Sequence, residues 1–251
     1  MTTKTSVRGR VRVEQGSKRI RAYLGGEIVA DTTRALLVWE GPHYPTYYFP
    51  ATDVNTALLT EDGGVAHSPS RGDGKLLTVR GGNQTRVGAA LRYEDSPFEE
   101  LKATIRLDWP AMDAWFEEDE EVFTHPRDPY TRVDILPSSR LVRIVVDGIT
   151  VAESARPTLL FETGLPPRYY LPKTDVRMDL LVRTSNSSHC PYKGDANYWS
   201  LTLEDGVVDD VAWSYRTPLP ESQKIAGLVC FYPEKIDLYV DGRLQGDLRS
   251  T

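Results

Sequence analysis

The sequence predicts a mainly β protein made of two tandem copies of one small domain, each a strongly bent or barrel-like antiparallel sheet. Three observations predict this. The chain repeats itself, its apolar residues fall in short runs rich in β-branched and aromatic side chains, and no segment carries a sustained helical stripe. The 19 glycines and 17 prolines suit a chain with many turns.

The repeat has a fixed spacing. His67 and His189 lie 122 positions apart, and at this offset residues 25–54 align without a gap with residues 147–176. The matched pairs are Gly26/Gly148, Ala30/Ala152, Arg34/Arg156, Glu40/Glu162, Tyr47/Tyr169, Tyr48/Tyr170, Pro50/Pro172, Asp53/Asp175, Gly72/Gly194, Asp73/Asp195 and Tyr93/Tyr215. A gap-free match of this length indicates duplication and fusion.

The boundary between the copies is predicted in an acidic run that ends in His-Pro and Asp-Pro, because a residue before proline favours extended chain. Arg10-Val11 is echoed by Arg132-Val133. We therefore expect a first domain over 1–121, a linker over 122–131 and a second domain over 132–251.

Within the second copy the strands can be placed in order. Residues 141–154 form two β-branched runs around Asp147-Gly148, a dipeptide typical of two-residue hairpin turns. One short helical turn is expected after Pro172. Further short strands are predicted at 158–164, 168–172, 198–203, 209–215, 227–233 and 235–242. In the last of these, apolar side chains alternate with the period of two of a half-buried strand.

Composition excludes several classes of protein. The net charge of −6 argues against non-specific nucleic-acid binding, which needs a cationic surface. No apolar run approaches the ~18 residues of a membrane span, and the N-terminal residues carry no signal-peptide core. Two cysteines are too few for a disulfide scaffold, so we expect a soluble cytoplasmic protein without a membrane partner.

No cofactor or metal is expected. His189, Cys190 and Cys230 supply at most three soft ligands, and no C-x-x-C pair supports a closed zinc site. Catalytic-triad and P-loop patterns are absent as well.

Several segments resemble family 427 of the domain-of-unknown-function series, a family common in bacteria and often found in tandem. The resemblance is carried by residues 125–144, 159–172, 189–199, 212–215 and 225–242, and more loosely by the first copy. It implies a β-tent-like fold, a group that includes the thalidomide-binding domain of cereblon, where aromatic residues cage a small imide. A nucleotidyltransferase-like label is sometimes attached to the family, but no paired-Asp metal site or Gly-Ser nucleotide motif supports it here.

The two copies differ in chemistry. Residues 189–199 hold a thiol, an imidazole, an ammonium, a carboxylate and three aromatic rings, whereas the equivalent residues 67–77 of the first copy lack the thiol and the aromatic rings. At the 122-residue offset the replacements are Ser68 for Cys190, Ser70 for Tyr192, Arg71 for Lys193, Leu76 for Tyr198, Leu77 for Trp199, Leu91 for Trp213 and Trp109 for Phe231. We therefore expect the site in the second copy, with the first copy as a scaffold.

The candidate catalytic residues are Cys190, Lys193 and Tyr192. Neighbouring cations could make Cys190 a thiolate nucleophile, or Cys190 could be a small buried residue at a turn. Lys193 could grip an anionic oxygen or act with a tyrosine as an acid–base pair, or it could pair with Asp195 in a loop. His189 is kept in the inert copy as His67, which favours a structural hydrogen bond.

An aromatic-lined pocket for a small molecule is the leading hypothesis. Its polar members would be Arg168 and Glu162; its aromatic walls would be Tyr170, Trp199, Trp213, Tyr215 and Tyr232, although ordinary core packing is the alternative for many of them. An enzyme acting on a small metabolite and an interaction module with an exposed aromatic face are the competing functions. The sequence leaves the ligand, the reaction and the oligomeric state open.

Overall fold

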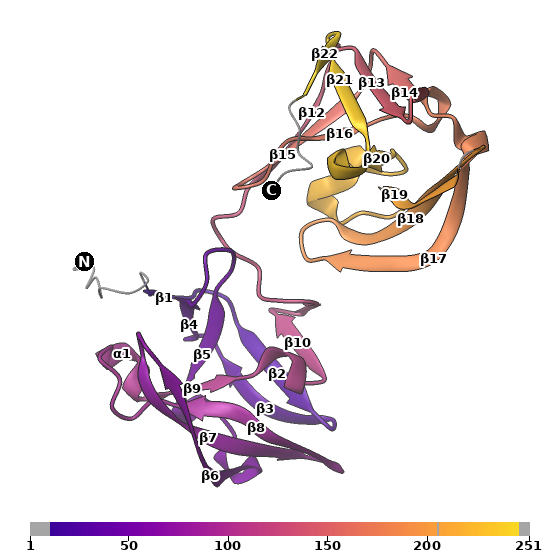
Figure 1. The fold of residues 1–251 in the computed structure, drawn as a ribbon. Helices are drawn as coiled ribbons and strands as arrows, with labels where there is room; N and C mark the ends of the chain where they lie inside the picture. The colour runs from indigo at the N-terminus through magenta and orange to yellow at the C-terminus, as the bar shows by residue number, and fades with distance from the viewer. Residues whose placement is uncertain (1–10, 205, 246–251) are drawn as a thin grey trace. The chain divides into compact units, whose positions relative to one another are not determined.

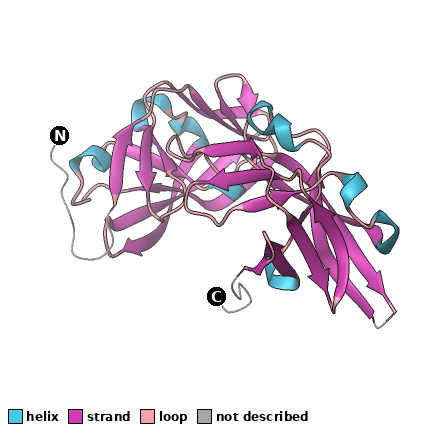
Figure 2. Cartoon of the chain, turned by 90° about the horizontal axis from the view of Figure 1, so that it is seen from above, coloured by secondary structure: helices cyan, strands magenta, loops and turns pink. Residues whose placement is uncertain are grey.

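The computed structural model describes residues 11–204 and 206–245, and the chain divides into two compact units, Met1–Asp128 and Pro129–Thr251. Strands make up most of each unit, and the helices are short single turns (Figures 1 and 2). Among the described residues, no helix has the length and apolar character needed to cross a membrane.

The described part of the first unit, residues 11–128, contains eleven strands: β1 (Arg12–Gln15), β2 (Ile20–Leu24), β3 (Glu27–Thr32), β4 (Leu36–Trp39), β5 (Thr46–Pro50), β6 (Leu59–Ser68), β7 (Gly72–Gly81), β8 (Gln84–Arg92), β9 (Thr104–Leu107), β10 (Ala114–Glu117) and β11 (Glu120–Glu121). Its helical turns are η1 (Ala51–Asp53), η2 (Thr56–Leu58), α1 (Glu99–Lys102) and η3 (Trp109–Ala111). The strands form an antiparallel sheet of order β1-β4-β5-β9-β8-β7-β6 and a second of order β11-β10-β2-β3.

The second unit repeats these elements in the same order. Its strands are β12 (Val133–Pro137), β13 (Val142–Val146), β14 (Ile149–Ser154), β15 (Thr158–Glu162), β16 (Arg168–Tyr170), β17 (Leu181–Cys190), β18 (Gly194–Leu203), β19 (Gly206–Tyr215), β20 (Cys230–Phe231), β21 (Asp237–Val240) and β22 (Arg243–Leu244). Its helical turns are η4 (Lys173–Asp175), η5 (Met178–Leu180), η6 (Pro220–Ile225) and η7 (Pro233–Lys235). This order confirms the predicted tandem, mainly β architecture.

Strand pairing shows why the sheets bend. Register shifts interrupt the pairing of β17 with β18 and of β18 with β19, and shifts of this kind increase local twist. The three strands follow one long curve (Figure 1). In the second unit the sheets β12-β15-β16 and β17-β18-β19-β20 touch through a single bridge, Leu171 to Val229. No sheet among the described residues closes, so the bent open form is the one observed.

The predicted offset of 122 changes near the end of the repeat. Ala90 and Ala212 lie 122 positions apart, but their partners in the sheet, Leu107 and Phe231, lie 124 apart. The prediction that Phe231 corresponds to Trp109 is therefore wrong, because the second copy gains two residues between β19 and β20. By the same register Cys230 corresponds to Arg106.

Each large sheet buries both of its faces. On the inner face of the second unit, Trp199, Leu201 and Phe231 join residues of β13 and β21 in one core. On the other face, Trp213 and Tyr215 join Ile225 of η6 in a second core. The first unit has the same division. Because alternate side chains of a strand point to opposite faces, β18 and β19 each carry two apolar sets, whereas the edge strand β17 is mostly exposed.

One polar contact recurs in both copies and fixes the chain after the fifth strand of each. The Asp175 carboxylate accepts hydrogen bonds from the Ser154 hydroxyl at 2.7 Å and from the Arg156 guanidinium at 2.8 Å. These hydrogen bonds hold the pKa of Asp175 well below its usual range. In the first copy Asp53 is held in the same way by Thr32 and Arg34.

The predicted linker differs from the structure at its start. The N–H of Val122 donates to Trp115 O at 2.8 Å, and the N–H of Arg127 donates to the Glu117 carboxylate at 3.1 Å. The Val122 side chain is buried. Residues 122–128 therefore pack on the first unit. The buried Val122 side chain and the hydrogen bond from Arg127 to the Glu117 carboxylate hold them there.

We expect Asp175→Asn to lower the free energy of unfolding of the second unit at pH 7 by about 1–3 kcal/mol, the range for hydrogen bonds to a charged group. The pKa of Asp175 is lowered on folding. The stabilisation is therefore complete above the unfolded pKa of about 3.9 and is lost as the pH falls through the folded pKa. Urea unfolding followed by hydrogen-exchange mass spectrometry reports this unit separately. Exposed Glu153→Gln is the control, and an equal loss at pH 2 and pH 7 would contradict the assignment.

Candidate functional site

Most of the predicted site residues gather on one face of the second unit. Tyr170 of β16, Trp213 and Tyr215 of β19, and Cys230 of β20 belong to one buried cluster, with Tyr198 and Tyr232 partly buried against it. These six residues are called the Trp213 cluster below. They meet because β18, β19 and β20 are neighbours and present alternate residues to the same face.

The aromatic rings of the Trp213 cluster pack edge to face and side by side. The Trp213 indole N–H donates to the Tyr170 hydroxyl at 3.2 Å, and the two rings meet edge-on at 87°. The Trp213 and Tyr232 ring centroids are 4.5 Å apart. Burial raises the pKa of Tyr170 and of Tyr215 above the ordinary value, so both phenols stay protonated at neutral pH.

Lys193 and Glu162 form a nearly buried ion pair beside this cluster. Their side chains are 11% and 9% exposed. The equivalent residues of the first copy, Arg71 and Glu40, approach to 3.4 Å. The expected loop pairing of Lys193 with Asp195 is not observed. Both copies keep a cation against this glutamate, so the pair belongs to the architecture of the domain. Because the Lys193 ammonium is already paired with the Glu162 carboxylate, its charge is neutralised and is not available to bind a substrate oxygen.

His189 has the structural role that its repetition indicates. Its Nδ1 lies 2.8 Å from Asp195 Oδ1, and His67 Nδ1 lies 2.6 Å from Asp73 Oδ1 in the first copy. In each pair the two residues are direct cross-strand partners.

The two cysteines are both free and differ in burial. Cys190 is half-buried, and Cys230 is fully buried. Burial raises the pKa of Cys230 to about 12, so this thiol is inert at neutral pH. The structure places Cys190 at the end of β17, where it pairs with Gly194, and a nucleophilic role for it stays a prediction.

Two predicted residues lie apart from the Trp213 cluster. Trp199 points to the opposite face of β18, into the inner core, with the Lys173 ammonium 5.5 Å from its ring centroid. Tyr192 lies in the turn between β17 and β18, and its carbonyl accepts a hydrogen bond from the Ser222 hydroxyl at 3.0 Å. The strand alternation that unites the other residues separates Trp199 from them.

Arg168 connects the Trp213 cluster to a cavity. Its guanidinium lies 5.6 Å from the Trp213 ring centroid. Its Nη1 is buried and has no hydrogen-bond partner within the part of the chain that the structure describes. In the first copy this position is Thr46.

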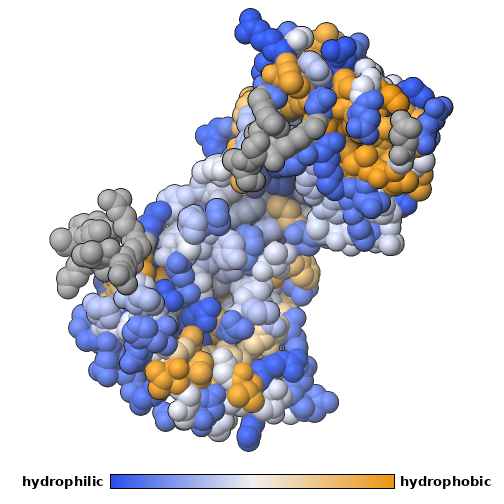
Figure 3. Space-filling view, viewed as in Figure 1, coloured by the Kyte–Doolittle hydropathy of each residue, from blue (hydrophilic) through white to orange (hydrophobic). Residues whose placement is uncertain are grey.

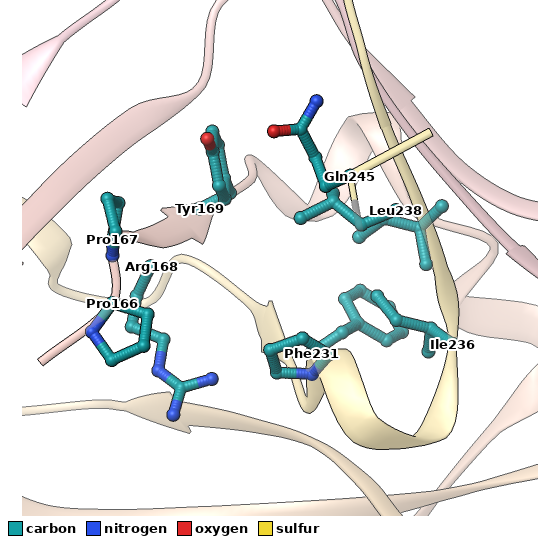
Figure 4. Close-up of a pocket in the computed structure, with 10 residues that line it drawn as sticks. Pro166, Pro167, Arg168, Tyr169, Phe231, Ile236, Leu238 and Gln245 are labelled. Atoms are coloured by element: carbon teal, nitrogen blue, oxygen red, sulfur yellow. The ribbon is translucent and has the colours of Figure 1, made fainter. Parts of the chain in front are cut away.

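The cavity has a volume of about 410 Å³ and opens between β16, β20 and β21. It is lined by Ile144, Pro166, Pro167, Arg168, Tyr169, Phe231, Pro233, Ile236, Leu238 and Gln245. Figure 4 shows Arg168 on the Pro166 side, across from Leu238 and Ile236. Apart from Arg168, none of the residues expected to form an aromatic pocket lines this cavity.

Sequence reasoning missed the apolar wall of the cavity. The alternation of Ile236 and Leu238 predicts a half-buried strand and no more, and Tyr169 is not among the predicted pocket residues. The sequence offered two signals, the alternating apolar residues of 236–240 and the two prolines of the loop before β16, but nothing in the sequence shows that they meet. The change in offset near Phe231 hid the relation between the two copies.

Other site chemistries have less support. Among the described residues no group of three or more His, Cys, Asp and Glu side chains could hold a metal ion. In the view of Figure 3, hydrophobic surface gathers on the second unit, where Ile149, Val182 and Val207 are among the exposed apolar side chains. The interaction-module alternative stays a prediction.

We expect Lys193→Met to lower the free energy of unfolding of the second unit by about 3 kcal/mol, because it leaves the Glu162 carboxylate buried and unpaired. Lys193→Arg should cost less than about 1 kcal/mol, since the first copy carries arginine at this position. Urea unfolding with hydrogen-exchange readout measures both. Equal losses in the two variants would show that the charge pair is not what stabilises this face.

Comparison with known proteins agrees with the repeat. A search of curated proteins finds no match. One family model matches residues 12–118 and again residues 134–242, and its description is domain of unknown function (DUF427). The two matches coincide with the two structural units and cover most of the chain, so this protein is a tandem member of the DUF427 family.

Proposed function

We propose that the second copy binds a small organic acid with an apolar body in the cavity beside Arg168. The observation that carries the proposal is a guanidinium on the wall of a mostly apolar cavity: Arg168 lines the cavity, and its Nη1 is buried with no hydrogen-bond partner among the described residues. The cavity volume of about 410 Å³ lies in the range of small-molecule sites.

The positive charge of Arg168 favours a ligand with a negatively charged headgroup. A guanidinium is always protonated and offers five N–H donors in a planar fork that suits a carboxylate. A buried donor without an acceptor costs roughly 1–3 kcal/mol. A ligand oxygen at the guanidinium would remove part of that cost, which supports an anionic headgroup.

The walls set the rest of the ligand. Ile144, Phe231, Ile236 and Leu238 provide apolar surface, and each buried methylene contributes about 0.8 kcal/mol. Three prolines add rigid apolar surface at the opening. The combination suits an aliphatic or cyclic acid of modest size.

In this proposal the aromatic residues position the arginine. The Trp213 ring holds the guanidinium by a cation–π contact, and Tyr170 holds Trp213 through a hydrogen bond. The predicted aromatic set thus acts behind the cavity wall. Both cysteines are free, which suits a reducing compartment such as the cytoplasm.

Calorimetric titration with octanoate tests the proposal, with octylammonium as the charge-reversed probe of the same length. We expect octanoate to bind and octylammonium to bind at least about tenfold more weakly, because only the carboxylate can accept from Arg168. Arg168→Gln should weaken octanoate binding at least about tenfold.

Arg177→Gln is the matched control, since Arg177 is an exposed arginine of the same unit whose guanidinium pairs with Asp179. It should leave octanoate affinity unchanged. Equal affinity for the two probes, or an Arg168→Gln variant that binds octanoate like the wild type, would sink the proposal.

A further inference from the structure

The first copy has a cavity of its own at the equivalent place in the fold. It has a volume of about 570 Å³ and is lined in part by Thr46, Tyr47 and Leu107. Thr46 and Tyr47 correspond to Arg168 and Tyr169, and the strand register makes Leu107 the counterpart of Phe231. The expectation that the first copy is only a scaffold therefore misses a second cavity.

The walls of this cavity are richer in aromatic rings than those of the second copy, where Tyr169 and Phe231 lie among aliphatic side chains. The rings of Trp109 and Trp115 stack with centroids 4.5 Å apart and planes 5° apart. Tyr44 and His125 stack at 3.9 Å and 7°. Tyr47 lies 6.4 Å from Trp109 and 6.3 Å from Trp115. With His43, six ring systems thus line one cavity.

The rings are held in place by hydrogen bonds. The Tyr47 hydroxyl donates to the buried Glu117 carboxylate at 2.6 Å. The Trp115 indole N–H donates to Trp109 O at 3.0 Å. Fixed rings lose little side-chain entropy when a ligand stacks on them, which favours binding.

The segment 122–128 completes the wall, because Thr124, His125 and Pro126 all line the cavity. The N–H of Val122 donates to Trp115 O, and the equivalent bond in the second copy runs from Gln245 to Leu238. The second-copy residues that would follow lie outside the described residues.

The polar groups differ in charge between the two copies. Thr46 replaces Arg168, so the first cavity lacks that cation, and Asp108 stands where the second copy has Tyr232. Asp108 is 39% exposed by side chain. Arg106 also lines the cavity, but it lies 3.3 Å from Glu40 and 3.9 Å from Asp108, so carboxylates balance its charge.

The geometry points to a second, separate binding site: the first copy takes a planar, nitrogen-containing aromatic ring, neutral or cationic, that stacks in this cavity with its N–H groups toward Asp108. Electron-rich indole and phenol faces attract cations and planar rings, and the carboxylate accepts from ring N–H donors. This site goes beyond the proposed function and stands on different residues.

Proflavine, a planar cation with ring and amino N–H donors, is the probe. Its fluorescence anisotropy is titrated against the full chain. Trp109→Leu should weaken binding roughly tenfold, the lower end for loss of one aromatic stacking partner. Asp108→Asn keeps an acceptor oxygen and loses the charge, and it should weaken binding roughly threefold to tenfold.

Glu99→Gln is the control, because Glu99 is a 77% exposed carboxylate of the same unit on α1. It should leave proflavine binding unchanged. An equal loss in Glu99→Gln and Asp108→Asn would mean binding to net charge and would overturn the site, as would wild-type affinity in both Trp109→Leu and Asp108→Asn. Since Asp108 is exposed, its variant keeps the test valid if Trp109→Leu does not fold.

The two sites fail independently. Octanoate binding should be unchanged in Asp108→Asn, and proflavine binding should be unchanged in Arg168→Gln. If Arg168→Gln alters proflavine binding as much as Asp108→Asn does, the first-copy site is overturned whatever octanoate shows. If octanoate does not bind while proflavine responds to Asp108→Asn, only the second-copy site is lost.

Discussion

The structure depends on one constraint: in each copy, the bent sheet that contains the long strands must bury both of its faces. A flat antiparallel sheet can leave one face in water. Here β18 and β19 place apolar side chains on both faces of their sheet, one set in each core. The bend brings the short helical turn before the ninth strand, α1 or η6, onto the second face. Leu101 fills this place in the first copy and Ile225 fills it in the second, each fully buried.

Burial of the second face explains the polar residues that both copies keep. Glu40 and Glu162 lie at this face, and a buried carboxylate needs a cation. The first copy supplies Arg71 and Arg106, and Tyr48 adds a hydrogen bond to Glu40 at 2.6 Å. In the second copy, Lys193 is the cation that pairs with Glu162 among the described residues. Cys230 takes the place of Arg106, and the cation near it on this face is Arg168, whose guanidinium lies 5.6 Å from the Trp213 ring centroid.

The two cavities lie at equivalent places in the two copies, near the point where the offset between the copies changes from 122 to 124. The frame is shared, since both cavities use the fifth and ninth strands of the copy. The linings diverge because the second copy gains two residues before β20 and exchanges Thr46 for Arg168. The two copies therefore have cavities at equivalent places: one has a guanidinium and mostly aliphatic walls, and the other has stacked rings and a carboxylate.

The sequence by itself determined the duplication, the mainly β class, the DUF427 resemblance and the structural role of His189, because each is a local or periodic property of the chain. It also selected residues that meet: Arg168, Glu162, Tyr170, Lys193, Trp213, Tyr215 and Tyr232. Only the tertiary structure decided that Trp199 faces away, that Glu162 neutralises Lys193, and that the cavity walls are other residues. Strand alternation separates neighbours in sequence, and register shifts and cross-sheet packing unite distant residues. The residue pattern of the sequence does not contain these spatial relationships between side chains.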